Sequence, residues 1–127
     1  MQRKKTRIAI VHPHRDLARA FRSRLELEGF DVVTFETHSV AMSHLSTFAV
    51  DLIITSDYTK GIRLRDFIDL VKSLNTLGDM AILALIDDRG SELDSYPNVA
   101  YIPKTAANST TVISGVYDLL GVSAIRR

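Results

Sequence analysis

The chain has 127 residues, of which 46% are hydrophobic and 24% are charged, values typical of a globular protein that folds as one domain. It contains no cysteine, which excludes disulfides and thiolate metal sites. No apolar run is long enough to span a bilayer, and none of signal-peptide length follows the basic start, so we expect a cytoplasmic protein without membrane contact.

The net charge of +1 is unevenly distributed. Six basic residues lie near the two ends of the chain: Arg3, Lys4, Lys5, Arg7, Arg126 and Arg127. Without these six, 10 basic residues face 15 acidic ones, which gives the body a charge of −5. An acidic body argues against direct nucleic-acid binding, and we interpret the basic ends as solubilising flanks of a fold.

The first half of the chain predicts three strands and two helices. A β-branched run at 7–11, bounded by Pro13, predicts a buried strand. The next segment, 15–28, predicts a helix ended by Gly29, because one face repeats every four residues at Leu17, Phe21 and Leu25. There follow a strand at 31–35, a helix at 39–47 with Val40, Ala41 and Leu45 inward, a strand at 51–55 and a polar loop at 56–61.

The second half continues the alternation of helices and strands. The helix at 62–75 has one apolar side, made of Leu64, Phe67, Ile68, Val71 and Leu74. Strands are predicted at 80–86 and 99–102, and the polar stretch 87–98 between them predicts only a short, weak helix. A last helix at 109–120 begins after Asn108 or at Ser109, either of which can cap its first turn.

Five strand–helix pairs in this order predict a doubly wound α/β fold. Strands that are apolar along their whole length are typical of a parallel sheet covered on both faces, and right-handed crossovers complete it. We expect a single domain, 1–127, with its core at about 6–121. In such sheets ligands bind outside the carboxyl ends of the strands. The residues predicted at those ends are His12, Pro13, His14, Ser56, Asp57 and Lys104.

Between Thr6 and Gly121 the chain resembles the receiver domain of bacterial response regulators. The stretch LELEGFDVVTF that ends at Phe35, the run DLII at 51–54 and the YIPK at 101–104 all fall at the family spacing. The resemblance implies a flavodoxin-like (βα)5 sheet with strand order 2-1-3-4-5. The spacing between Ile86 and Lys104 is short for the family, which implies a shortened fourth helix.

The resemblance also identifies positions for phosphate chemistry. In the family two acidic residues after the first strand hold Mg²⁺, an aspartate after the third strand accepts phosphate, and a hydroxyl residue and a lysine contact the phosphoryl group. In this chain His12 and Pro13 stand at the positions of the acidic pair, and Ser56 stands at the position of the acceptor. The hydroxyl position is occupied by Leu85 or Ile86. The lysine is retained as Lys104, and Tyr101 matches the family's switch aromatic. Mg²⁺ requires carboxylate oxygens, so the resemblance implies that metal-dependent phosphorylation is lost.

We therefore expect a phosphorylation-independent signalling module in a two-component or related pathway, not an enzyme, with no catalytic residue, metal or cofactor. Its partner would be a kinase, a phosphotransfer protein or an output domain, with a homodimer as another assembly. Arg15, Arg19 and Arg22 share one face of the first helix, which makes them a candidate docking face for an acidic partner. A solvated helix face accounts for them equally well.

Two alternatives remain open. Asp57 would make the chain a conventional phospho-accepting regulator if the strand end slipped by one residue, although side-chain alternation turns it toward the other face. His12, His14 and Lys104 would instead form a pocket for a ligand or, together with Asp57, for a transition metal, since imidazole suits Zn²⁺. His38 and His44 are too weakly placed to add to that pocket.

Overall fold

The computed structural model describes residues 5–56, 62–74, 80–86 and 98–121. In chain order the elements are β1 (Arg7–Val11), α1 (Arg15–Leu27), β2 (Asp31–Phe35), α2 (His38–Leu45), β3 (Leu52–Ser56), α3 (Leu64–Lys72), β4 (Ala81–Ile86), β5 (Val99–Pro103), a short 3-10 helix η3 (Lys104–Ala106) and α4 (Ser109–Leu120). The helix expected within 87–98 falls, apart from Asn98, outside the described residues.

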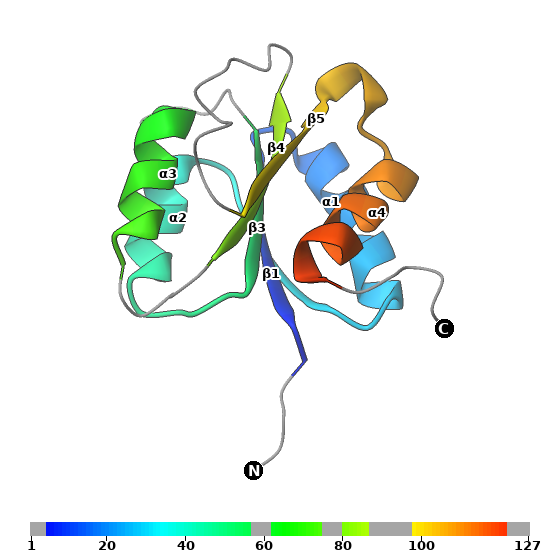
Figure 1. The fold of residues 1–127 in the computed structure, drawn as a ribbon, viewed down its shortest axis with the longest axis horizontal. Helices are drawn as coiled ribbons and strands as arrows, with labels where there is room; N and C mark the ends of the chain where they lie inside the picture. The colour runs from blue at the N-terminus through cyan, green and yellow to red at the C-terminus, as the bar shows by residue number, and fades with distance from the viewer. Residues whose placement is uncertain (1–4, 57–61, 75–79, 87–97, 122–127) are drawn as a thin grey trace.

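The five strands form one parallel sheet in the order β2-β1-β3-β4-β5, which confirms the predicted doubly wound, flavodoxin-like topology. Figure 1 shows α2 and α3 against one face of the sheet, and α1 and α4 against the other. No helix in the described ranges is long and apolar enough to cross a membrane.

Both faces of the sheet are buried, as the apolar strands predict. Every residue of β3 and β4 is buried. Ile54 and Leu85 pack in the cluster that includes α1 and α4, whereas Ile53 and Ile86 pack in the cluster that includes α2 and α3. This alternation continues to the end of each strand, and it decides which face of the sheet a terminal side chain joins.

The end of β3 lies one residue further than the sequence suggests. Ser56 was expected to begin a polar loop, but it is the last residue of β3 and pairs with Leu85 of β4. The pairing places Ser56 inside the sheet edge, with only 1% of its surface exposed.

Two helical residues predicted to face inward point elsewhere. Leu17 is 46% exposed and Val40 is 44% exposed. A spacing of four residues advances a helix by about 400°, so Leu17 is turned about 80° from Leu25, and Ala18 takes the buried position instead. On α2 the inward position belongs to His38, three residues before Ala41.

His38 connects three elements on the α2–α3 side of the sheet. It is fully buried and its ring stacks on Phe67, with 4.2 Å between the centroids. Its Nδ1 lies 2.7 Å from the carbonyl oxygen of Ile62, and its Nε2 lies 2.6 Å from Oγ1 of Thr55 in β3. Because a carbonyl only accepts, Nδ1 carries the proton and the neutral Nε2 accepts from the Thr55 hydroxyl. Burial lowers the pKa of His38 below 6.5, and the hydrogen bond to Ile62 partly offsets this.

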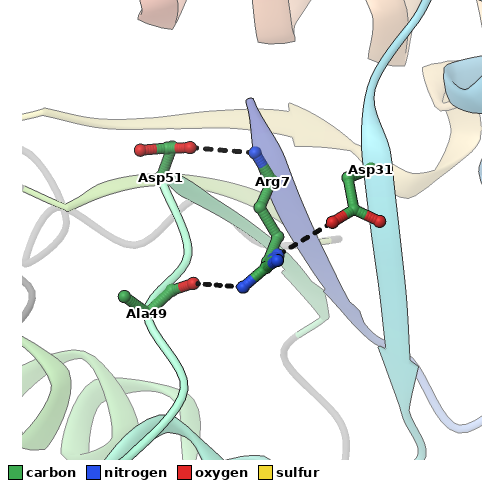
Figure 2. A network of polar contacts seen from close by, with 4 residues as sticks. All are labelled: Arg7, Asp31, Ala49 and Asp51. Atoms are coloured by element: carbon green, nitrogen blue, oxygen red, sulfur yellow. Dashed lines mark hydrogen bonds and ion pairs between the residues drawn. The ribbon is translucent and has the colours of Figure 1, made fainter. Parts of the chain in front are cut away.

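A polar network around Arg7 holds the opposite, amino edge of the sheet (Figure 2). The backbone N–H of Arg7 donates to Asp51 at 2.8 Å, and its Nε donates to Asp31 of β2 at 2.9 Å. Its Nη1 reaches the carbonyl oxygen of Ala49 at 3.4 Å, and the guanidinium lies 4.4 Å from the centroid of the Phe48 ring. Arg7 is therefore a structural residue that joins β1, β2 and the turn before β3, not part of a solubilising flank.

The depressed pKa of His38 predicts a pH-dependent stability. Below about pH 6.5 the unfolded chain binds a proton that the folded chain resists, so the free energy of unfolding falls as the pH falls. The variant His38→Gln should lose about 1–3 kcal/mol at pH 7.5, because the Thr55 and Ile62 partners are left poorly satisfied. Its stability should then decline less than that of the wild type between pH 7.5 and pH 5, as measured by urea unfolding.

His44→Gln is the matched control, because His44 is an exposed histidine on the same helix. It should retain the wild-type dependence on pH. An unchanged pH slope in His38→Gln would show that His38 does not resist protonation in the folded chain.

Candidate functional site

A cleft of about 230 Å³ lies at the carboxyl edge of the sheet. We call it the carboxyl-edge cleft; its lining residues are His12, Pro13, His14, Leu17, Phe21, Ser56, Leu85, Lys104 and Ala107. The strand register explains why these residues lie close together. Val11 pairs with Thr55, so His12 and Ser56 occupy the neighbouring ends of β1 and β3. Lys104 directly follows β5, and its backbone carbonyl accepts from the N–H of Ala107.

The structure brings together five of the residues predicted at the strand ends: His12, Pro13, His14, Ser56 and Lys104. Ile86 does not join them, because its side chain packs with α2 and α3 on the far face of the sheet. Leu85, the other candidate for the hydroxyl position, pairs with Ser56 and lines the cleft.

Two further predicted residues do not contribute to the cleft as described. Tyr101 lies on the edge strand β5, opposite Ala84, and packs partly against the α2–α3 cluster. Asp57 lies outside the described residues, so the alternative in which it accepts phosphate stays a hypothesis.

His12 is the most buried polar side chain that follows β1. Its side chain lines the cleft with 7% of the residue exposed, and its backbone N–H donates to the carbonyl of Phe35 at 3.0 Å. The Nδ1 atom accepts the backbone N–H of His14 at 3.1 Å. The neutral ring therefore carries its proton on Nε2, for which the described part of the chain supplies no hydrogen-bond acceptor.

The surroundings of His12 favour its neutral form. Burial, followed by the electrostatic effects of His14 and Lys104, lowers the pKa of His12 from 6.5 to about 4. Among the described residues that line the cleft there is no carboxylate.

A metal site at this edge is not assembled by the described residues. They contain no group of three histidine, cysteine, aspartate or glutamate side chains that could hold a metal ion. Of the ligands named for a transition metal, His12 and His14 stand with ring centroids 5.4 Å apart, and His12 already uses Nδ1 to accept from the His14 backbone.

A second, more open groove of about 320 Å³, which we call the α1 groove, is lined by Arg15, Arg19 and Arg22 of α1. Arg15 forms an ion pair with Glu36, and Arg22 pairs with Glu26 at 3.1 Å. Arg19 is exposed and forms no ion pair with any described residue. The predicted shared face is therefore present, but much of its charge is neutralised within the chain.

The apolar wall of the cleft and the role of His38 are not among the features predicted from the sequence. Leu17 and Phe21, predicted on the apolar face of the first helix, both line the cleft, and Leu17 does so while partly exposed. The spacing of His38, three residues before Ala41 and seven before Leu45, places it on the buried stripe of α2. That spacing is the signal that would have found it.

No protein-family model matches the sequence, and no curated protein is similar to it at a significant level. Solved structures are similar in fold. The chemotaxis response regulator CheY4 of Vibrio cholerae superposes with a TM-score of 0.82 at 15% identity, covering 91% of this chain and 99% of that one. A receiver protein from Sinorhizobium medicae gives 0.80 at 20% identity, with 93% and 96% covered.

A CheY-like receiver domain protein from Methanospirillum hungatei gives a TM-score of 0.81 at 16% identity, covering 93% of this chain and 95% of that one. These identities are low, so the likeness is one of architecture. Together with the strand order, it shows that this chain has the fold of the response-regulator receiver domain.

Proposed function

We propose that this chain is a receiver-like signalling module that works without phosphorylation, by binding a protein partner in a two-component or related regulatory pathway. The observation that carries the proposal is the composition of the carboxyl-edge cleft, which lacks a carboxylate among its described lining residues. Receiver chemistry needs carboxylates both for Mg²⁺ and for the acceptor, so a cleft built this way supports binding and not phosphoryl transfer.

The residues at the phosphate positions are poor substitutes for the missing acids. His12 is neutral and Pro13 has no ligand atom in its side chain, so neither provides the hard oxygen that Mg²⁺ requires. Ser56 has a hydroxyl, but a hydroxyl becomes a nucleophile only beside an effective base. With its pKa lowered to about 4, His12 is a weak base at neutral pH.

The partner is the second part of the proposal. The structures with this fold include the signal receiver domain of a signal transduction histidine kinase from Syntrophus aciditrophicus and that of an HD domain-containing protein from Pseudomonas fluorescens. By analogy, a kinase, a phosphotransfer protein, an output domain or a second copy is the expected partner here. The α1 groove, with Arg19 exposed at its rim, suits a partner with acidic side chains.

Acetyl phosphate tests the loss of phosphorylation. We expect no phosphorylated species in the intact mass spectrum after incubation with acetyl phosphate and Mg²⁺. A receiver of known activity, run in parallel, verifies the reagent. A stoichiometric gain of one phosphoryl group that disappears in Asp57→Asn would contradict the proposal and establish the rival role of Asp57.

Metal titration gives an independent check of the same cleft. A ligand that binds only the native state raises the melting temperature. The melting temperature in millimolar Mg²⁺ should equal that in Na⁺ at the same ionic strength. A parallel titration with Zn²⁺ tests the alternative in which the histidines bind a transition metal. A saturable rise with Mg²⁺ alone would show that the chain holds the metal after all.

Charge reversal on α1 tests the docking surface, once a partner has been recovered by pull-down. Arg19→Glu should slow association several-fold at low salt, with a smaller effect at high salt, because exposed charges steer encounter and salt screens them. Reversing Arg15 and Arg22 as well should slow it further. The matched control is Arg65→Glu, an exposed position on α3 across the sheet. Equal kinetics for Arg19→Glu and Arg65→Glu would assign Arg19 to an ordinary solvated surface.

A further inference from the structure

The carboxyl-edge cleft contains a buried hydrogen-bond donor that no described residue satisfies. The ring of His12 has its Nδ1 occupied by the backbone N–H of His14, so its proton resides on Nε2. Only 7% of His12 is exposed, and within the described part of the chain nothing accepts from that Nε2–H. A buried N–H without an acceptor costs free energy, and such groups are met by water or by a ligand. An oxygen acceptor that enters the cleft would satisfy it.

The other polar residues of the cleft do not turn it into a site for ions. Ser56 and Lys104 already take part in interactions within the chain, so we assign neither of them to a ligand. His14 is exposed, and its imidazole can donate or accept a hydrogen bond. Burial is the largest of the effects that lower the pKa of His12 to about 4, so this ring is neutral at pH 7. Among the described lining residues, the buried donor left free for a ligand is therefore a neutral one.

The rest of the described lining is apolar. It consists of Pro13, Leu17, Phe21, Leu85 and Ala107. Phe21 and Leu85 are buried in the core, whereas Leu17 is 46% exposed and Pro13 is partly exposed. An apolar body that covered Leu17 and Pro13 would remove their surface from water, which is favourable.

We propose that the carboxyl-edge cleft binds a small neutral molecule that has an apolar body and a carbonyl oxygen. The carbonyl accepts from the Nε2–H of His12, and the body packs on Pro13, Leu17 and Phe21. The volume of the cleft is about 230 Å³. An apolar cavity of about 150 Å³ is large enough to bind benzene, so the cleft has room for a ring with one short polar substituent.

The lining distinguishes this ligand from an ion. An anion would give up its water for one neutral buried donor, because Lys104 already has a partner, and that exchange is unfavourable. A metal cation would find no carboxylate among the described residues of the lining. His14 can donate to or accept from either kind of ligand, so it does not reverse the preference. An uncharged carbonyl loses less hydration and gains the hydrogen bond from His12.

His12 also borders the α1 groove, but that groove does not suit the same ligand. It is lined by Arg15, Arg19, Arg22 and Glu36, so an apolar body placed there would cover charged groups. The apolar body therefore selects the carboxyl-edge cleft, and the carbonyl selects His12 within it.

Acetophenone is the probe that tests the site, in titrations of the whole chain at pH 8, where imidazoles are ordinarily neutral. In ¹H–¹⁵N NMR spectra we expect saturable shifts at the amides of His12, His14 and Leu17, with a dissociation constant in the millimolar range. The Nε2–H signal of His12 should move downfield and exchange more slowly with water, because it gains an acceptor.

Three related compounds separate the two halves of the ligand from its lack of charge. Ethylbenzene, which lacks the oxygen, should leave the Nε2–H signal of His12 in place. Acetone, which lacks the ring, should cause no saturable shift at the same concentrations. Benzoate, which carries a charge, should bind more weakly than acetophenone.

Variants locate the binding. Leu17→Gln changes an exposed side chain and should fold normally; it should weaken acetophenone several-fold, because the ring loses an apolar contact. The matched control is Leu27→Gln, which changes an 82% exposed side chain at the end of the same helix and should bind as the wild type does. His12→Phe keeps a ring but removes the donor, so the preference for acetophenone over ethylbenzene should fall about fivefold. Leu17→Gln and the wild-type Nε2–H signal test the site even if His12→Phe does not fold.

Absence of saturable acetophenone binding would overturn the inference. So would an unmoved Nε2–H signal, a benzoate affinity equal to that of acetophenone, or equal affinities of Leu17→Gln and Leu27→Gln. The inference goes beyond the proposed function and can fail separately from it. A chain that binds no acetophenone and takes up no phosphoryl group lacks the ligand site and keeps the phosphorylation-independent role.

Discussion

The parallel pairing of β1 with β3, in the middle of a sheet covered on both faces, is the constraint on which the rest of the structure depends. Buried backbone groups must pair, so the register of these two strands is set along their whole length. It places His12 beside Ser56 at the carboxyl edge, while at the amino edge the Arg7 network joins β1 to β2 and to the turn before β3. Alternation then sends Thr55 to His38 on one face and Ser56 to the cleft on the other.

This scaffold places a buried, neutral His12 and the side chain of Lys104 at the carboxyl edge of the sheet. Carboxylates at the same strand ends would attract Mg²⁺, whereas the described lining of the cleft contains no carboxylate. The proposed role in partner binding is consistent with this composition, since it requires neither a metal nor a covalent step.

The topology and most of the strand and helix boundaries could be predicted from the sequence, because apolar strands and amphipathic helices leave strong periodic patterns. The last helix, with Asn108 as its cap, matches the prediction residue for residue. The sequence also identified His12, Pro13, Ser56 and Lys104 through the resemblance. The sequence could not predict that Leu17 is exposed, because that depends on a rotation of the helix by less than the angle between two successive residues. It also could not choose between Leu85 and Ile86, because that choice depends on the strand register. His38 was missed because a histidine on a buried stripe is recognisable only once its partners across the sheet, Thr55 and Ile62, are known.

The most direct test of the account is the ionisation of His12, followed by NMR of its imidazole as the pH is lowered. The account predicts a ring that is protonated on Nε2 at pH 7 and a pKa near 4, because the ring is buried among cationic neighbours. A carboxylate within the cleft, from Asp57 or any other residue, would favour the charged imidazole and raise that pKa. A value at or above the ordinary 6.5 would therefore contradict the central proposal, that no carboxylate serves His12 at this edge of the sheet.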